Sequence, residues 1–290
     1  MGTFLQLTAA GLSVGMVYAM LSMGLILLLR AVGVMNFAQG SFMVLGAYTF
    51  FYVYGQLEVT GIIGLIIMAA FFLFFGAIFM LCCYWPLRHS KWPQALVITT
   101  MGASTFITEL CIIVCGPRVQ TMPPILDGSI RIGKFILQYQ YLFIFVVSIL
   151  IMLAIYILFD KLYAGRAMAA ASQNRYAADL IGIPTFLTIM FTYIIVMLCA
   201  GFAGYLIAPV YFVRTTLTTF QSKAFAGIIL GGLGNLPGAI IGSIIIGLVD
   251  SYSTYFTTTY KDMFAYGILL LVLVFRPQGL FAGISHSNKA

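Results

Sequence analysis

Charge is the scarcest feature of this chain of 290 residues. Only 7% of the residues are Asp, Glu, Lys or Arg, whereas 62% are hydrophobic. Soluble domains carry about 25% charged residues, so this surface could not be kept in water and a lipid bilayer is its natural solvent. The apolar runs are continuous and do not alternate with polar residues, which excludes barrel strands and favours helices. The sequence therefore predicts an all-α, polytopic transmembrane helical bundle.

Several kinds of chemistry are missing from the sequence too. There is no Gly-x-x-x-x-Gly-Lys-Ser/Thr loop for a nucleotide phosphate, and the two histidines, His89 and His286, have no nucleophile or metal-ligand set beside them. We therefore expect no catalytic residue, no metal and no cofactor. The net charge of +7 is spread between the apolar runs, which favours contact with membrane lipid and argues against nucleic-acid binding. All five cysteines fall within apolar runs, as small buried side chains do: Cys82, Cys83, Cys111, Cys115 and Cys199.

The apolar runs give about eight membrane segments in one domain, residues 1–290. The N-terminus lacks the basic region of a cleavable signal, so we expect the first run to be retained as a span. The segments lie near Leu7–Leu29, Val32–Tyr54, Ile62–Cys83, Gln94–Val114, Tyr139–Phe159, Thr185–Ala208, Phe225–Val249 (interrupted) and Asp262–Phe281.

Orientation depends on the interrupted segment. If it turns back, eight of the 14 Lys and Arg residues share the side of the C-terminus, and the positive-inside rule places the N-terminus outside and the C-terminus in the cytoplasm. If it crosses, the two sides carry seven each and the termini share a side.

Two segments break the helical pattern at membrane depth, Asn36–Ser41 and Gly231–Gly238. Such backbone is tolerated only where protein or a water-filled cavity covers it. Glycine and proline cost a helix about 1 and 3 kcal/mol, so one helix should end near Leu230 and the next should begin near Pro237. Paired discontinuous helices indicate a transport pathway, although the glycines are explained equally well by a hinge or a tight loop. Polar groups in the first break would then face a wet interior.

Glu109 is an acid deep within an apparent span, where a charge costs about 2.5–3.5 kcal/mol. It either lines a pathway or is neutralised by a polar neighbouring helix. Asp250, near a helix end, is expected at the membrane interface. The candidate pathway residues are Asn36, Gln39, Ser41, Glu109, Gly234 and Asn235.

The loop of residues 160–184 is alanine-rich, but it is too polar to cross the bilayer. Gly182 is placed as a helix C-terminal cap and Pro184 as a stop, so a short helix should lie on a membrane face. Such a helix is either a solvated linker or an element that carries force from a partner into the bundle.

Four segments resemble the branched-chain (hydrophobic) amino acid permeases of bacterial ABC importers. They are "NFAQGSFMVLGAY", "GRAMAAASQNRYAADLIGI", "GIILGGLGNLPGAIIGSIIIGLVDSY" and "YGILLLVLVFRPQGLFAG". These segments stretch from the first spans to the C-terminus, so the resemblance extends over essentially the whole chain. The resemblance implies a bacterial inner-membrane protein that works with two cytoplasmic ABC ATPase subunits, a second homologous permease subunit and an external substrate-binding protein. The loop resembles the cytoplasmic coupling helix that docks on the ATPase.

Carried over by position, the resemblance implies a docking element in this loop. In one departure from the family, Gln173 and Asn174 stand where many members carry acids, which puts that part of the partner contact in doubt. The docking residues would be Gly165, Arg166, Arg175, Ala178, Asp179 and Gly182.

The predicted function is the substrate-translocating subunit of an ATP-driven importer for branched-chain or other hydrophobic amino acids. A permease of the same family for urea or short amides remains an alternative, as does a self-sufficient channel or ion-coupled carrier. A membrane-embedded enzyme is disfavoured because no nucleophile-and-base pair is present.

Overall fold

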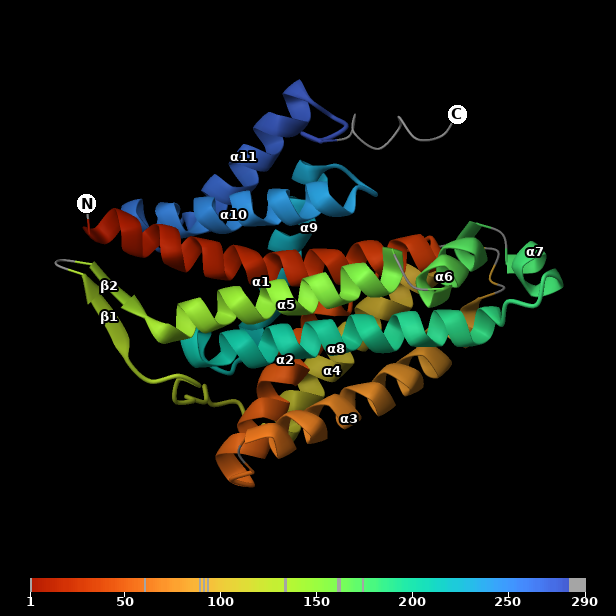
Figure 1. Ribbon diagram of the computed structural model, residues 1–290, viewed down its shortest axis with the longest axis horizontal. Helices are drawn as coiled ribbons and strands as arrows, with labels where there is room; N and C mark the ends of the chain where they lie inside the picture. The colour runs from red at the N-terminus through yellow and green to blue at the C-terminus, as the bar shows by residue number, and fades with distance from the viewer. Residues whose placement is uncertain are drawn as a thin grey trace. The chain divides into compact units, whose positions relative to one another are not determined.

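The structure is a computed structural model that describes residues 2–59, 61–88, 90, 92, 94–132, 135–160, 163–173 and 175–281. Helices dominate these residues, as the composition predicts (Figure 1). The α-helices are α1 (Gly2–Val32), α2 (Gln39–Phe50), α3 (Gly61–Phe79), α4 (Gln94–Cys115), α5 (Tyr139–Asp160), α6 (Tyr163–Gln173), α7 (Arg175–Leu180), α8 (Thr185–Tyr211), α9 (Thr219–Gly231), α10 (Leu236–Phe256) and α11 (Lys261–Phe275).

Within the described residues, six helices are long and apolar enough to cross a membrane. The predicted second segment is instead α2 followed by a π-helical turn, Phe51–Gln56, and the predicted last segment is α11, which has 15 residues. The count of eight segments is therefore not confirmed. The six helical stretches are Thr3–Val32, Gly61–Leu87, Gln94–Cys115, Tyr139–Phe159, Thr185–Tyr211 and Leu236–Phe256.

The chain divides into two compact units. The first unit contains Met1–Met23, Pro123–Leu150 and Thr219–Ala290. The second contains Gly24–Met122 and Ile151–Thr218.

The first unit is built on an antiparallel pair, α9 and α10, joined by a short glycine-rich turn (Figure 1). Gly231 lies against the backbone of Gly238, and Gly242 lies against the carbonyl of Gly227. A Cβ atom at these positions would overlap the facing backbone, so small residues are what lets the two helices approach this closely. The interrupted segment thus turns back on itself, and the orientation of the termini stays a prediction.

The first and last described segments of the chain lie at opposite ends of α10. Thr8 Oγ1 is 2.7 Å from the hydroxyl of Tyr252 near the C-terminal end of that helix. The tail after α11 reaches the other end, where the backbone N–H of Leu280 donates to the carbonyl of Leu230 at 2.8 Å. Between these ends α1 runs antiparallel to α10, and Gly15 contacts the backbone of Ile244.

A two-stranded hairpin in the first unit was not predicted from the sequence, in which the region reads only as a connection. Strands β1 (Ser129–Ile132) and β2 (Phe135–Gln138) pair antiparallel, and α5 follows β2 directly (Figure 1). Gln6 Nε2 donates to the carbonyl of Ile136 at 3.2 Å, which ties the hairpin to α1. The short runs of β-branched and aromatic residues favour strands, but they are too brief to stand out in the sequence.

The second unit has α8 at its centre, with α2 and α3 packed against it. Gly46 of α2 abuts the backbone of Gly201, and Gly204 abuts the carbonyl of Met43. On α3, a Cβ at Gly76 would lie 2.9 Å from the Cα of Ile194. These close glycine contacts hold α2 flat against α8 and so position the first polar break.

Candidate functional site

The first polar break lies at the start of α2 in the second unit, and its side chains are buried in protein. Asn36 is 2% exposed, whereas Gln39 and Ser41 are fully buried. Asn36 Oδ1 accepts from the backbone N–H of Ala38 at 2.9 Å, and the hydroxyl of Ser41 donates to the Ala38 carbonyl at 2.7 Å. The sequence Asn-Phe-Ala-Gln-Gly-Ser thus builds a local turn that leads into the helix.

Helix α4 closes this turn from one side. Thr100 Oγ1 accepts from the backbone N–H of Phe37 at 3.2 Å. A small cavity of about 10 Å³ beside Asn36 is lined by Thr100, Tyr84 and Tyr193, which is room for about one water molecule. The break is therefore packed closed in this conformation and is not an open conduit. We call its buried residues Asn36, Gln39 and Ser41 the polar seam.

The side chain of Gln39 in this break has incomplete hydrogen bonding. Its Nε2 donates to the carbonyl of Val196 on α8 at 3.4 Å, but its fully buried Oε1 has no hydrogen-bond partner within the described structure. The amide packs over Gly24, where a Cβ would lie 2.6 Å from Nε2. An unsatisfied buried acceptor is costly, so Oε1 is suited to accept from water or from a donor on a ligand once the seam opens.

The second break forms the turn between α9 and α10 in the first unit. Helix α9 ends at Gly231 and α10 begins at Leu236, which confirms the prediction from glycine and proline propensities. Gly234 has a φ of 87°, and a Cβ there would meet nothing within 4 Å. Gly234 thus adopts the left-handed backbone conformation that glycine adopts most readily, as expected in a tight glycine turn.

Asn235 connects this turn to the start of α10 and to the segment after α11. Its Oδ1 accepts from the backbone N–H of Gly238 at 3.3 Å, so it caps α10, and Pro237 occupies the first turn as expected. Its Nδ2 donates to the carbonyl of Phe281 at 2.9 Å. The segment after α11 is therefore bonded to the tip of the hairpin.

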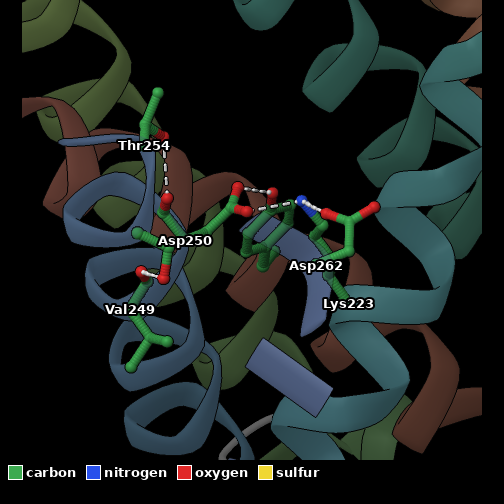
Figure 2. Close-up of polar contacts among 7 residues, drawn as sticks. Lys223, Val249, Asp250, Thr254 and Asp262 are labelled. Atoms are coloured by element: carbon green, nitrogen blue, oxygen red, sulfur yellow. Dashed lines mark hydrogen bonds and ion pairs between the residues drawn. The ribbon is translucent and has the colours of Figure 1, made fainter. Parts of the chain in front are cut away.

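A buried charge cluster in the first unit was missed by sequence reasoning. Lys223 Nζ lies 2.7 Å from Asp250 Oδ1 and 2.9 Å from Asp262 Oδ1 (Figure 2). The hydroxyl of Tyr18 donates to Asp250 Oδ2 at 3.0 Å. Asp250 is 2% exposed, so its carboxyl is buried within the protein, and its expected place near the membrane interface stays a prediction.

The antiparallel pairing of α9 and α10 could have revealed this cluster. Because Gly231 faces Gly238 and Gly227 faces Gly242, Lys223 falls about one turn from Asp250 on the facing helix. A long lysine side chain bridges that distance. The signal is therefore present in the sequence, but it emerges only once Lys223 is placed inside the helical hairpin.

Glu109 occupies a different setting from the buried polar seam. It lies on α4, about six residues before the last residue Cys115, and its side chain is exposed. Glu109 makes no hydrogen bond or ion pair to another residue of the described structure. The structure thus places Asn36, Gln39 and Ser41 together, sets Glu109 apart from them on the surface of α4, and holds Gly234 and Asn235 in the other unit.

The loop predicted as one short helix forms two, α6 and α7, in the second unit. Gly165 is buried against the backbone of Phe159, and Arg166 is exposed. Arg175 is the first residue of α7, and Gln173 is the last of α6, whereas Asn174 lies outside the described residues.

The end of α7 is fixed to the start of α8. Asp179 Oδ1 accepts from the hydroxyl of Thr185 at 2.8 Å and from its backbone N–H at 3.4 Å. Ala178 is 2% exposed, and Gly182 has a φ of 82°, as expected for a helix C-terminal cap. Asp179 therefore acts inside the chain, as a link between the loop helices and a long helix of the bundle.

Within the described part of the chain, no group of three or more His, Cys, Asp or Glu side chains could hold a metal ion. The five cysteines form no disulfide bond with one another, and Cys111 and Cys199 are buried.

Comparison with known proteins gives a consistent result over nearly the full length. The family model described as "Branched-chain amino acid transport system / permease component" matches residues 7–273. The high-affinity branched-chain amino acid transport system permease protein LivH of Escherichia coli K12 is 32% identical over 96% of this chain and 95% of its own length. LivM, a permease protein of the same system in that organism, is 27% identical over 91% of this chain and 68% of its own length. A solved structure, PsaBC from Streptococcus pneumoniae in complex with Fab, has a TM-score of 0.51 at 13% identity and covers 98% of this chain and 95% of that chain.

Proposed function

Because the chain belongs to the permease family of branched-chain amino acid transport systems, we propose that it is the substrate-translocating subunit of an ATP-driven importer. The cargo would be branched-chain or other hydrophobic amino acids, and separate ATPase subunits would supply the energy. The observation that carries the proposal is the family match over residues 7–273, joined to a bundle with six membrane-length helices among the described residues. It is a transporter subunit and not an enzyme.

The proposed partners are two cytoplasmic ATPases, an external substrate-binding protein and a second permease. Two different permease proteins of one Escherichia coli transport system, LivH and LivM, are both similar to this chain. This similarity supports a second subunit that is homologous to the chain and not a mere copy of it.

We propose that the pathway opens at the two helix breaks. Gln39 supports this idea because its buried carbonyl oxygen lacks a partner in the described structure and could accept from the ammonium group of an amino acid. Asn36 and Ser41 would flank that route in the second unit, and Gly234 and Asn235 would provide a hinge in the first. Glu109 stays a candidate for the same pathway, although its exposed position on α4 also suits contact with a partner.

The loop helices α6 and α7 are the proposed docking element for the ATPase. Arg166 is exposed and available to a partner, whereas Asp179 is bonded to Thr185 and would pass the movement into α8. The proposed orientation has the N-terminus outside and the C-terminus in the cytoplasm. It is supported by the first and last described segments lying at opposite ends of α10 and by the excess of basic residues on the C-terminal side.

The test is uptake of labelled leucine, isoleucine and valine by membranes that hold the complete transporter. We expect ATP-dependent uptake, and mild-detergent purification of the tagged chain should recover two ATPases. Arg166→Ala should lower uptake per ATP hydrolysed several-fold, whereas Arg118→Ala, in an exposed connection on the other proposed side, should not. ATP-independent uptake would instead favour the channel or carrier, and uptake of urea alone would favour the amide alternative.

A further inference from the structure

The exposed face of α4 differs in chemistry from the exposed face of its neighbour α3. On α3 the exposed side chains are all apolar or alanine, with Ile62, Ile66 and Phe74 at 75%, 61% and 69% exposure. On α4 the exposed face includes Gly102, Thr105 and Glu109. Lipid suits the first face, whereas the carboxyl of Glu109 on the second face is unfavourable against lipid.

Residues of α4 spaced by three or four share one side of the helix. Ile98, Gly102, Thr105, Glu109 and Ile113 follow this spacing and are all exposed. We call them the α4 stripe. A Cβ at Gly102 would meet nothing within 4 Å, so the middle of the stripe leaves room for another backbone to approach.

Glu109 decides what kind of neighbour can cover the stripe. It lies about 9 Å along the axis from the end of α4, well inside a membrane-length helix. A carboxyl group at that depth is unfavourable against hydrocarbon chains, and such residues usually face protein or water. A lipid acyl chain has no donor to offer the carboxyl, whereas a neighbouring helix with a basic, amide or hydroxyl side chain does.

The surface beside the stripe is hollowed in a way that also fits a helix. Leu110 and Val114, next to Glu109 and Ile113 on the same helix, line an apolar groove of about 390 Å³ together with residues of α2 and α3, among them Tyr48 and Phe71. Bulky apolar side chains of a packed helix would fill this groove while the polar part of that helix meets Glu109.

We infer that the α4 stripe is the contact surface for a transmembrane helix of the second, homologous permease, and that Glu109 pairs there with a donor side chain of that helix. This inference rests on the proposed function, because it takes its partner from it. Glu109 then sets which permease is accepted, since a partner without the donor would leave the carboxyl unpaired in the interface.

The first test places a photo-crosslinking amino acid at Thr105 in the full transporter in native membranes, with a matched control at Phe74 on α3. We expect Thr105 to give a protein adduct that peptide mapping assigns to the homologous permease, and Phe74 to give lipid adducts. Lipid adducts at both positions, or an adduct of Thr105 to another class of protein or to a second copy of this chain, would overturn the inference.

The second test compares Glu109→Leu with Glu109→Gln, which keeps the shape and a hydrogen-bonding group. Recovery of the second permease with the tagged chain should fall about tenfold for Glu109→Leu and less than about threefold for Glu109→Gln. Glu58→Gln, in an exposed connection, serves as the control. If Glu109→Leu lowers uptake but leaves recovery unchanged, Glu109 acts in the pathway and the inference is wrong. Recovery of ATPases with the unmodified chain reports on the proposed function separately, so the two failures can be told apart.

Discussion

Replacing Lys223 by methionine should destabilise the protein strongly, because it removes one partner of a buried ion pair and leaves the other. Asp250 is 2% exposed and would keep only the Tyr18 hydroxyl at 3.0 Å. Breaking a buried pair in this way costs about 3–5 kcal/mol, or roughly two to nearly four orders of magnitude in the unfolding equilibrium. The ion pair with Asp262 contributes less to stability, since the Asp262 side chain is 52% exposed and solvated by water. Asp262→Asn should therefore lower the free energy of unfolding by at most about 1 kcal/mol.

The measurement is the free energy of unfolding in mixed detergent micelles. It is made for the single variants Lys223→Met, Asp250→Asn and Asp262→Asn, and for the double variant Lys223→Met/Asp250→Asn. The double variant removes both charges, so it should recover most of the loss of Lys223→Met. A Lys223→Met protein no less stable than Asp262→Asn would refute the reasoning. The reasoning would also be refuted if the double variant lost as much stability as Lys223→Met and Asp250→Asn lose together, since the two charges would then not act on each other.

Two further predictions concern glycine packing and the turn. Gly204→Val should lower the free energy of unfolding by several kcal/mol and reduce the amount of folded protein, because the added atoms meet the carbonyl of Met43 between α2 and α8. The yield of folded monomer in detergent, measured on a size-exclusion column, tests this. An unchanged yield would mean that α2 and α8 do not pack as closely as described. Asn235→Ala should cost about 1–2 kcal/mol by loss of the α10 cap and the bond to Phe281, and protease cleavage near the C-terminus should quicken. Asn235→Asp, which keeps only the capping oxygen, should restore the cap but not the protection of the tail.

Features that depend on composition and local propensity are the ones that the sequence predicts best. Hydropathy predicts the long helices, and the cost of glycine and proline in helices predicts the break between α9 and α10 within one or two residues. The left-handed φ of Gly182 is expected in the same way from its place after a run of helix formers. Each of these features depends on a few neighbouring residues, so a single sequence contains them.

Features that the sequence does not predict depend on how segments of the chain pair in space. The pairing of Lys223 with Asp250 requires the register of two helices, and the bond between Asp179 and Thr185 requires the geometry of a loop. The hairpin of β1 and β2 is held by pairing between two runs of four residues, each too short to show a period. The geometry with which segments pair, and not local propensity, is the missing information in each case.

At the first polar break, the argument for a wet pathway rests on Gln39. Polar side chains at membrane depth are expected to need water, yet Asn36 and Ser41 bond to their own turn, so their presence alone does not require a conduit. Gln39 Oε1 is buried with no hydrogen-bond partner in the described structure, and it would become exposed if α2 moved away from α8. Transport should therefore depend on Gln39 more steeply than on Ser41. Gln39→Leu, which keeps the volume and removes the acceptor, should lower uptake at least about tenfold, with Ser41→Ala as the matched control; equal effects of the two substitutions would assign the break to folding and not to the passage of cargo.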